Sequence, residues 1–274
     1  MDATTDIKEE ISVSVGLGMP IEYKGLKIYP VKMRDYKRFM DAVDVFNYDK
    51  NVTGDINLIQ MSYLEFLIYI ILGQDDIKNK FIDIIELCFN IKYDEGLKNK
   101  SDDEKDSLLM EEVDDQVNIY INGRNICFII NGNKVKIIIG DTLLNAKDFD
   151  NIKRIILYQN IEGYDDRPMS NDFKSLIKKY YSLKNRGVKS PTLEYKIGTV
   201  ISSSSYTLDK ILDMPMRLFD ITFSSIVDKY DYIVNMMALT QGAKIEPEHW
   251  VYKKDKDIYD DIFSDPNELK KKIM

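Results

Sequence analysis

The residues best suited to chemistry stand together near the end of the chain. The stretch GAKIEPEHWVYK, residues 242–253, holds the sole histidine, His249, and the sole tryptophan, Trp250. Beside a cysteine, a histidine can serve as the base of a nucleophilic couple. The two cysteines, Cys88 and Cys127, lie in apolar runs, where we expect buried and unreactive thiols. We therefore interpret His249 and Trp250 as packing residues that follow a turn at Gly242, and not as an active site.

Other catalytic signatures give no stronger signal. The sequence has no GxxxxGK[ST] phosphate loop, and one histidine cannot build a multi-histidine metal site. Adjacent acids such as Asp165 and Asp166 arise by chance in a chain with 46 acidic residues, so they indicate no general acid and base. The sequence favours a non-enzymatic protein without a cofactor, and metal-dependent hydrolysis through scattered carboxylates stays open as an alternative.

The overall charge limits the classes of partner. With 46 acidic and 38 basic residues, the formal charge is −8, which disfavours nucleic acid and membrane phosphates as partners. The most apolar run, residues 63–72, is about half of the ~20 residues that a membrane-spanning helix needs, and Glu65 interrupts it. Two cysteines without a CxxC motif are typical of a reducing compartment. We expect a protein of the cell interior, or of a particle assembled there.

Hydrophobic periodicity predicts an N-terminal region over residues 1–93, made of a β-hairpin and helices. The hairpin turns at Lys24-Gly25, and Pro30 follows its second strand. Residues 55–72 and 76–91 then read as two buried helices. Residues 94–116 carry ten acidic residues against three lysines, which predicts a solvated, disordered excursion.

A β-meander and further helices are predicted for residues 117–252. Asn122-Gly123 and Asn131-Gly132 each separate β-rich runs, which is typical of two-residue hairpin turns. With such turns Ile119 would face Ile126, and Ile126 would face Ile137, on a wholly apolar face. Expected helix starts are Asn145 with Asp148 in the first turn, Thr192, Thr207 and Pro215.

The last predicted helix, which begins near Pro215, has a wide apolar side, so we expect a central position for it. Leu218, Ile221, Phe223, Ile226, Tyr230, Ile233 and Met237 run along this side. Residues 253–274 form a charge-balanced helical tail with apolar residues at helical spacing. The fold class expected from these elements is α+β, with a mostly α-helical body, a small antiparallel β-meander and an N-terminal β-hairpin.

Three stretches together resemble a known group of proteins. They are IEYKGLKIYPVKMRDYKRFM, FDNIKRIILYQN, and MPMRLFDITFSSIVDKYDYIVNMMALTQGAKI with EHWVYK close behind it. They are similar to bacteriophage proteins encoded among the tail genes of phages and prophages of low-GC Gram-positive bacteria. This group resembles tail assembly chaperones, which bind the tape-measure protein while the tail is built.

The resemblance implies a non-enzymatic role in virion morphogenesis, through protein–protein interaction in the host cytoplasm or in the virion. The expected partner is a phage tail protein, with the tape-measure protein as the first candidate. A structural component of the tail or baseplate is the main alternative, and an acidic metal-dependent enzyme is the second. Aromatic residues suit adaptable contact surfaces. The partner-contact residues that we expect are Tyr180, Tyr181, Trp250, Tyr259 and Phe263.

Overall fold

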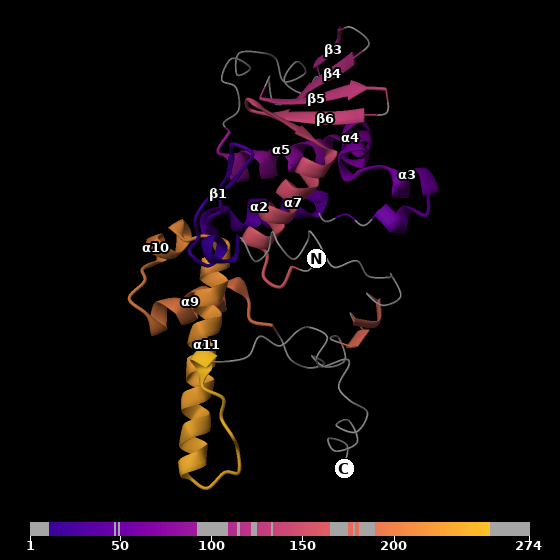
Figure 1. The fold of residues 1–274 in the computed structure, drawn as a ribbon. Coiled ribbons are helices and arrows are strands. Elements are labelled where there is room, and N and C mark those ends of the chain that lie inside the picture. Colours follow the sequence, from indigo (N-terminus) through magenta and orange to yellow (C-terminus); the bar gives the residue numbers. More distant parts are fainter. Residues whose placement is uncertain are drawn as a thin grey trace. The chain divides into compact units, whose positions relative to one another are not determined.

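The computed structural model has the expected α+β architecture (Figure 1). It describes residues 11–46, 48, 50–91, 109–113, 116–121, 125–132, 134–164, 175–177, 179–180 and 190–252. The chain forms two compact units. Unit 1 consists of Met1–Asp166 with Thr207–Ile221, and unit 2 consists of Arg167–Tyr206 with Thr222–Met274.

The N-terminal hairpin of unit 1 is confirmed. Strand β1 (Ile21–Tyr23) pairs with β2 (Leu26–Ile28) in antiparallel register. Lys24 and Gly25 have φ values of 51° and 79°. Positive φ at both central residues is the signature of the type I′ turn, which matches the twist of the strands that it joins. Ile21 and Ile28 face each other on the buried side of the hairpin.

Helices and short 3-10 turns follow the hairpin. They are η1 (Met33–Asp35), α2 (Tyr36–Ala42), η2 (Val43–Phe46), η3 (Lys50–Thr53), α3 (Ile56–Gln60), α4 (Tyr63–Gly73) and α5 (Asp75–Phe89). The prediction of one buried helix over 55–72 is wrong, because α3 and α4 are separate and α3 buries no residue. The break has a local cause: Ser62 and Glu65 form a reciprocal capping box that starts α4. Glu65 therefore has a structural use inside an apolar run.

The sheet of unit 1 is larger than the three-stranded meander predicted. Its order is β3 (Leu109–Val113), β4 (Gln116–Ile121), β5 (Ile126–Asn131), β6 (Lys134–Ile139) and β7 (Thr142–Asn145), each antiparallel to the next. Figure 1 shows α4 and α5 beneath one face of this sheet. Strand β3 lies inside the stretch expected to be disordered. Its Met110 pairs with Ile119 of β4. Of the stretch expected to be disordered, residues 94–108, 114 and 115 lie outside the described residues.

The predicted faces of the meander are correct, but the predicted partners are shifted by two residues. Ile119 faces Phe128 and not Ile126, and Phe128 faces Ile137. Asn131 pairs with Lys134, so the second turn begins at Gly132, one residue later than predicted. A shift of two preserves the face of every side chain, since strand side chains alternate with period two. Asn-Gly thus located the second turn only to within one residue, and Asn122-Gly123 lies outside the described residues.

Helix α7 (Ala146–Asn160) begins as predicted. The side chain of Asn145 accepts a hydrogen bond from the backbone N–H of Asp148, and the Asp148 carboxylate accepts one from the N–H of Asn145. Lys24 Nζ lies 2.8 Å from Asp148 Oδ1, and the Tyr23 hydroxyl donates to the same oxygen. Asp148 therefore joins the N-terminus of α7 to the turn of the β1–β2 hairpin.

Four phenylalanines join the N-terminal helices to the sheet in one core. Ring centroids lie 6.1 Å apart for Phe46 and Phe81, 5.8 Å for Phe81 and Phe128, and 5.7 Å for Phe46 and Phe149. These rings come from η2, α5, β5 and α7, and all four are fully buried. Such aromatic pairs stabilise a core beyond the area that they bury.

The remaining helices are α9 (Leu193–Ser203), α10 (Leu208–Asp213) and α11 (Met216–Thr240). Thr192 and Thr207 cap α9 and α10 through their hydroxyl oxygens, as expected. The predicted central position of α11 is wrong. Its buried residues are Met216 and Phe219 alone, both in the part that belongs to unit 1. The spacing of apolar residues in the sequence predicts the apolar side of this helix, but it does not predict which part of the protein packs against that side.

Truncation of Phe81 tests the shared core. We expect Phe81→Ala to lower the free energy of unfolding by about 3–5 kcal/mol, because a cavity would open between the rings of Phe46 and Phe128. Phe81→Leu keeps most of the volume and should cost less than about 1.5 kcal/mol. Urea denaturation followed by circular dichroism measures both variants. A loss below about 1 kcal/mol for the alanine variant would contradict a core held by these rings.

The cap at Asp148 predicts a pH dependence. Desolvation acts to raise the pKa of Asp148, but hydrogen bonds from Lys24 and Asn145 outweigh it and hold the pKa below its usual value. Such a group stabilises the fold above its unfolded pKa, about 4, and this contribution is lost as the pH falls through the folded value. Asp148→Asn should cost about 1 kcal/mol at pH 7, because Lys24 is half exposed and screened.

Denaturation of wild type and Asp148→Asn at pH 7 and at about pH 3 measures this effect. The difference in unfolding free energy between the two proteins should shrink at the lower pH. A difference that stays constant would show that the carboxylate charge does not stabilise the cap.

Candidate functional site

A short segment, residues 29–33, which is extended as far as Lys32 and enters η1 at Met33, fixes the start of α11 in unit 1. The Tyr29 N–H donates to the carbonyl of Cys88 at the end of α5 (2.6 Å), and the Val31 N–H donates to Asn160 Oδ1 at the end of α7 (2.7 Å). The Val31 carbonyl accepts from the N–H of Met216, the first residue of α11 (2.8 Å). Three helices thus meet on one extended strand, and the segment sets where α11 begins.

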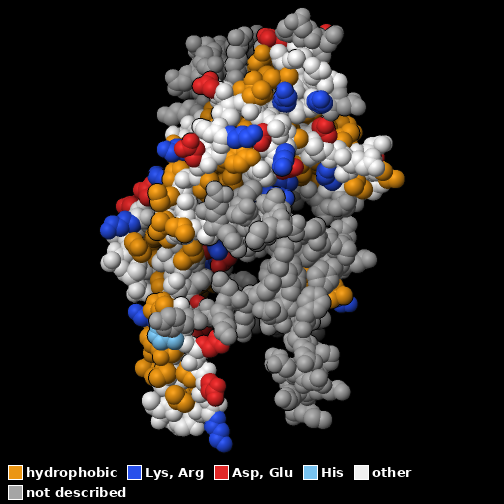
Figure 2. All heavy atoms as spheres, viewed as in Figure 1, with side chains coloured by type: hydrophobic (Ala, Val, Ile, Leu, Met, Phe, Trp, Pro, Cys, Tyr) orange, Lys and Arg blue, Asp and Glu red, His pale blue; other side chains and the backbone are white. Residues whose placement is uncertain are grey.

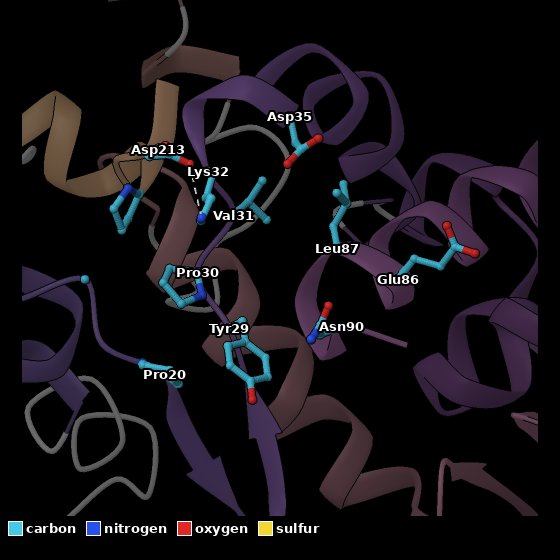
Figure 3. A pocket seen from close by; sticks show the side chains of 12 residues that line it. Pro20, Tyr29, Pro30, Val31, Lys32, Asp35, Glu86, Leu87, Asn90 and Asp213 are labelled. Carbon is cyan, nitrogen blue, oxygen red and sulfur yellow. Dashed lines mark hydrogen bonds and ion pairs between the residues drawn. The ribbon is translucent and has the colours of Figure 1, made fainter. Parts of the chain in front are cut away.

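A cavity of about 590 Å³ lies beside this segment. Figure 3 shows its lining. Tyr29, Pro30, Val31, Lys32, Asp35, Glu86, Leu87, Asn90 and Asp213 line it, with Gly18, Pro20 and Pro215. Lys32 Nζ lies 3.3 Å from Asp213 Oδ1, and Arg34 Nη2 lies 2.6 Å from the same oxygen. A hydrogen bond from Lys32, together with the charges of Lys32 and Arg34, lowers the pKa of Asp213. Asp213 is therefore a poor proton acceptor.

Glu86, Cys88 and Cys127 of unit 1 are held in unreactive forms. Glu86, at the cavity wall, forms an ion pair with Arg38. Burial raises the pKa of the Cys88 thiol, and burial is also the main cause of the raised pKa of Cys127. A thiol must lose its proton to act as a nucleophile, so neither cysteine is activated. Within the described ranges, no three His, Cys, Asp or Glu side chains gather as metal ligands would.

The second feature is an apolar surface on α11, in unit 2. Between Thr222 and Thr240 none of its residues is buried. Tyr230 is 52% exposed, Val234 62% and Met237 61%, and Val227 is exposed as well. Figure 2 shows hydrophobic side chains gathered along α11, at the lower left of the view. A helix that is apolar on most of its circumference is normally covered by other parts of a protein.

These exposed residues follow a defined spacing. Starting from the half-buried Phe223, the apolar positions are four, three, four and three residues apart: Phe223, Val227, Tyr230, Val234 and Met237. At about 100° per residue they lie within an arc of about 80° on the helix surface. We call these five residues the α11 stripe. Alternating spacings of three and four are the pattern of a coiled-coil seam.

The chain after α11 returns along the other side of this helix. Gly242, with φ of 91°, ends α11 in a Schellman motif, in which the Gly242 N–H donates to the Leu239 carbonyl and the Ala243 N–H to the Ala238 carbonyl. The ring of His249 then lies 4.9 Å from that of Tyr232. Tyr232 is two positions from Tyr230, or about 200° around the helix, so this contact lies on the side opposite the α11 stripe. At one end of the stripe, Lys196 Nζ of α9 lies 5.3 Å from the centroid of the Phe223 ring.

The structure places the residues predicted for partner contact as follows. Trp250 is half-buried and stacks on His249, with ring centroids 6.2 Å apart, and the Val251 N–H donates to Nδ1 of His249. The ring of His249 contacts α11 at Tyr232, in a packing contact. Tyr180 is half-buried in a helical stretch. Tyr181, Tyr259 and Phe263, together with the predicted tail helix over 253–274, lie outside the described residues.

Sequence reasoning missed Val227 and Val234, the two valines of the α11 stripe. It grouped the apolar residues of this helix into one wide side and assigned that side to the core. The alternation of three and four was nevertheless readable, and it separates a narrow seam from the rest of the apolar surface. What the sequence lacked was any sign that this seam is left uncovered.

None of the described helices is both long and apolar enough to cross a lipid bilayer. Comparisons with known proteins found no matching family model, no matching curated protein and no matching solved structure. The functional interpretation therefore rests on the α11 stripe and on the sequence resemblance.

Proposed function

We propose that this protein is a non-enzymatic assembly factor of bacteriophage tails, which binds the tape-measure protein during tail morphogenesis. The observation that carries the proposal is the α11 stripe, where Tyr230, Val234 and Met237 are each more than half exposed. Contiguous exposed apolar surface on a folded chain is typical of a site for protein contact. The resemblance to tail assembly chaperones supports the identity of the partner.

The physical role of the stripe is to cover apolar side chains of the partner before they aggregate. Burial of apolar surface contributes about 25 cal/mol per Å², so a few side chains supply useful affinity. Methionine suits this task because its flexible side chain adapts to different apolar shapes, and tyrosine is enriched at protein contacts. The exposed part of the stripe, from Val227 to Met237, is about 15 Å long. An interface of that size is typical of a contact that forms and dissociates, as assembly requires.

A charge placed in the stripe tests the proposal. We expect Val234→Asp to weaken binding of the purified full chain to the tape-measure protein by about tenfold or more, because a carboxylate would be desolvated at the contact. Leu239→Asp is the matched control, since Leu239 is 40% exposed on the same helix but lies outside the stripe. Its affinity should stay within about threefold of wild type.

Titration calorimetry measures both affinities, and circular dichroism checks that both variants keep their helix content. Equal affinities for the two variants, or no binding of the tape-measure protein by wild type, would contradict the proposal. Stoichiometric amounts of the chain in purified particles would instead identify a structural component of the virion.

A further inference from the structure

We infer that the α11 stripe takes one α-helix of a partner, whose own apolar seam repeats at spacings of three and four and is flanked by basic residues. This inference rests on the proposed function and adds the chemistry of the contact. It comes from the spacing of the stripe, from the charges beside it, and from the poor fit of a second copy.

The spacing identifies the occupant as a helix. An extended strand would need side chains at every second position. The five residues of the α11 stripe lie within about 80° of the helix surface, and the valines alternate with larger residues: Val227 and Val234 stand between Phe223, Tyr230 and Met237. In a coiled coil, each side chain of such a seam inserts into a hole formed by four residues of the facing helix.

The charges beside the stripe identify the flanks of the partner. Asp231 is exposed and lies about 40° from Val227 around the helix, and Asp228 lies further on the same side. The opposite flank carries Ile226 and Ile233, both half-buried. Lys229 lies on that opposite flank too, about 80° from Met237 and beyond the two isoleucines. On the side of Asp231 a partner helix therefore meets an acidic flank, which lysine or arginine complements.

A second copy of this chain fits the stripe poorly. In an antiparallel pair, Val227 would face Met237 and Tyr230 would face Val234, and the two Asp231 carboxylates would then approach each other at the axis. In a parallel pair, Asp231 would lie against Ile226 of the other copy. Neither arrangement gives Asp231 a cation. Each copy also carries a formal charge of −8, so the two chains repel each other.

Synthetic helical peptides test the inference with the full-length protein. The first has a leucine and valine seam at alternating spacings of three and four, flanked by lysines, and the second has the same seam flanked by glutamates. The third is a scrambled version of the lysine peptide, and the fourth is the chain's own residues 253–274. Fluorescence anisotropy at about 150 mM salt, where the Debye length is about 8 Å, compares their affinities.

The lysine-flanked seam should bind about fivefold or more tightly than the glutamate-flanked one, and the scrambled peptide should not bind. Val234→Asp should weaken the lysine-flanked peptide by about tenfold, and Leu239→Asp should not. Asp231→Lys should reduce the preference for lysine by about threefold, the range of an exposed ion pair.

Four outcomes would overturn the inference. Two concern the designed peptides: the lysine-flanked and glutamate-flanked peptides bind equally, or the scrambled peptide binds. In the third, the peptide of residues 253–274 binds more tightly than the lysine-flanked peptide. In the fourth, the protein forms a dimer that Val234→Asp dissociates. Binding of the tape-measure protein without a charge preference would leave the proposed function standing alone. The reverse pattern, in which peptides bind with the expected preference and the tape-measure protein does not, would leave only the inference standing.

Discussion

The backbone of residues 29–33 is the constraint on which the rest of unit 1 depends. Polar groups in an apolar interior must be paired, because an unpaired one costs about 1–3 kcal/mol. This segment meets that requirement through Cys88 of α5, Asn160 of α7 and Met216 of α11. Asn160 is 1% exposed, and its amide nitrogen donates to the Ile156 carbonyl while its oxygen accepts from Val31. One buried side chain therefore fixes where α7 ends and where the extended segment runs.

That arrangement gives α11 two different parts. Its first turns are fixed to unit 1, where Met216 and Phe219 are buried. From Thr222 onwards the helix belongs to unit 2, and its apolar residues are at most half-buried. The return of the chain at Gly242 uses the side of Tyr232, which is opposite the α11 stripe. The fold thus keeps an apolar seam at the surface, which is costly for a protein without a partner and useful for one that binds a helix.

The fold was predictable where local chemistry decides it. Lys24-Gly25, Asn145 with Asp148, and Thr192 each act within a few residues, and the structure has the predicted turn or cap at each place. The faces of the meander followed from side-chain alternation. The residues that pair across the strands could not be predicted in the same way, because a shift of two residues leaves every side chain on its face. The positions of the turns decide between such registers.

The candidate site was predictable only in part. The apolar residues of α11 were visible in the sequence, but whether Val234 meets a core or solvent depends on distant contacts that no local pattern contains. Tyr180 and Trp250 were proposed for partner contact on residue type alone, and both are half-buried. The residues of the α11 stripe differ from those two in their spacing, which alternates between three and four, and in the exposure of most of their side chains. The exposure of a side chain is known only from the folded chain.

Hydrogen–deuterium exchange of the full chain, alone and with the tape-measure protein, tests the central claim most directly. Exchange reports local opening of the backbone, and a helix docked on α11 would suppress that opening. The account predicts slower exchange over residues 222–240, with residues 29–33 and the cavity beside them unchanged. Slower exchange around the cavity, with α11 unaffected, would contradict it.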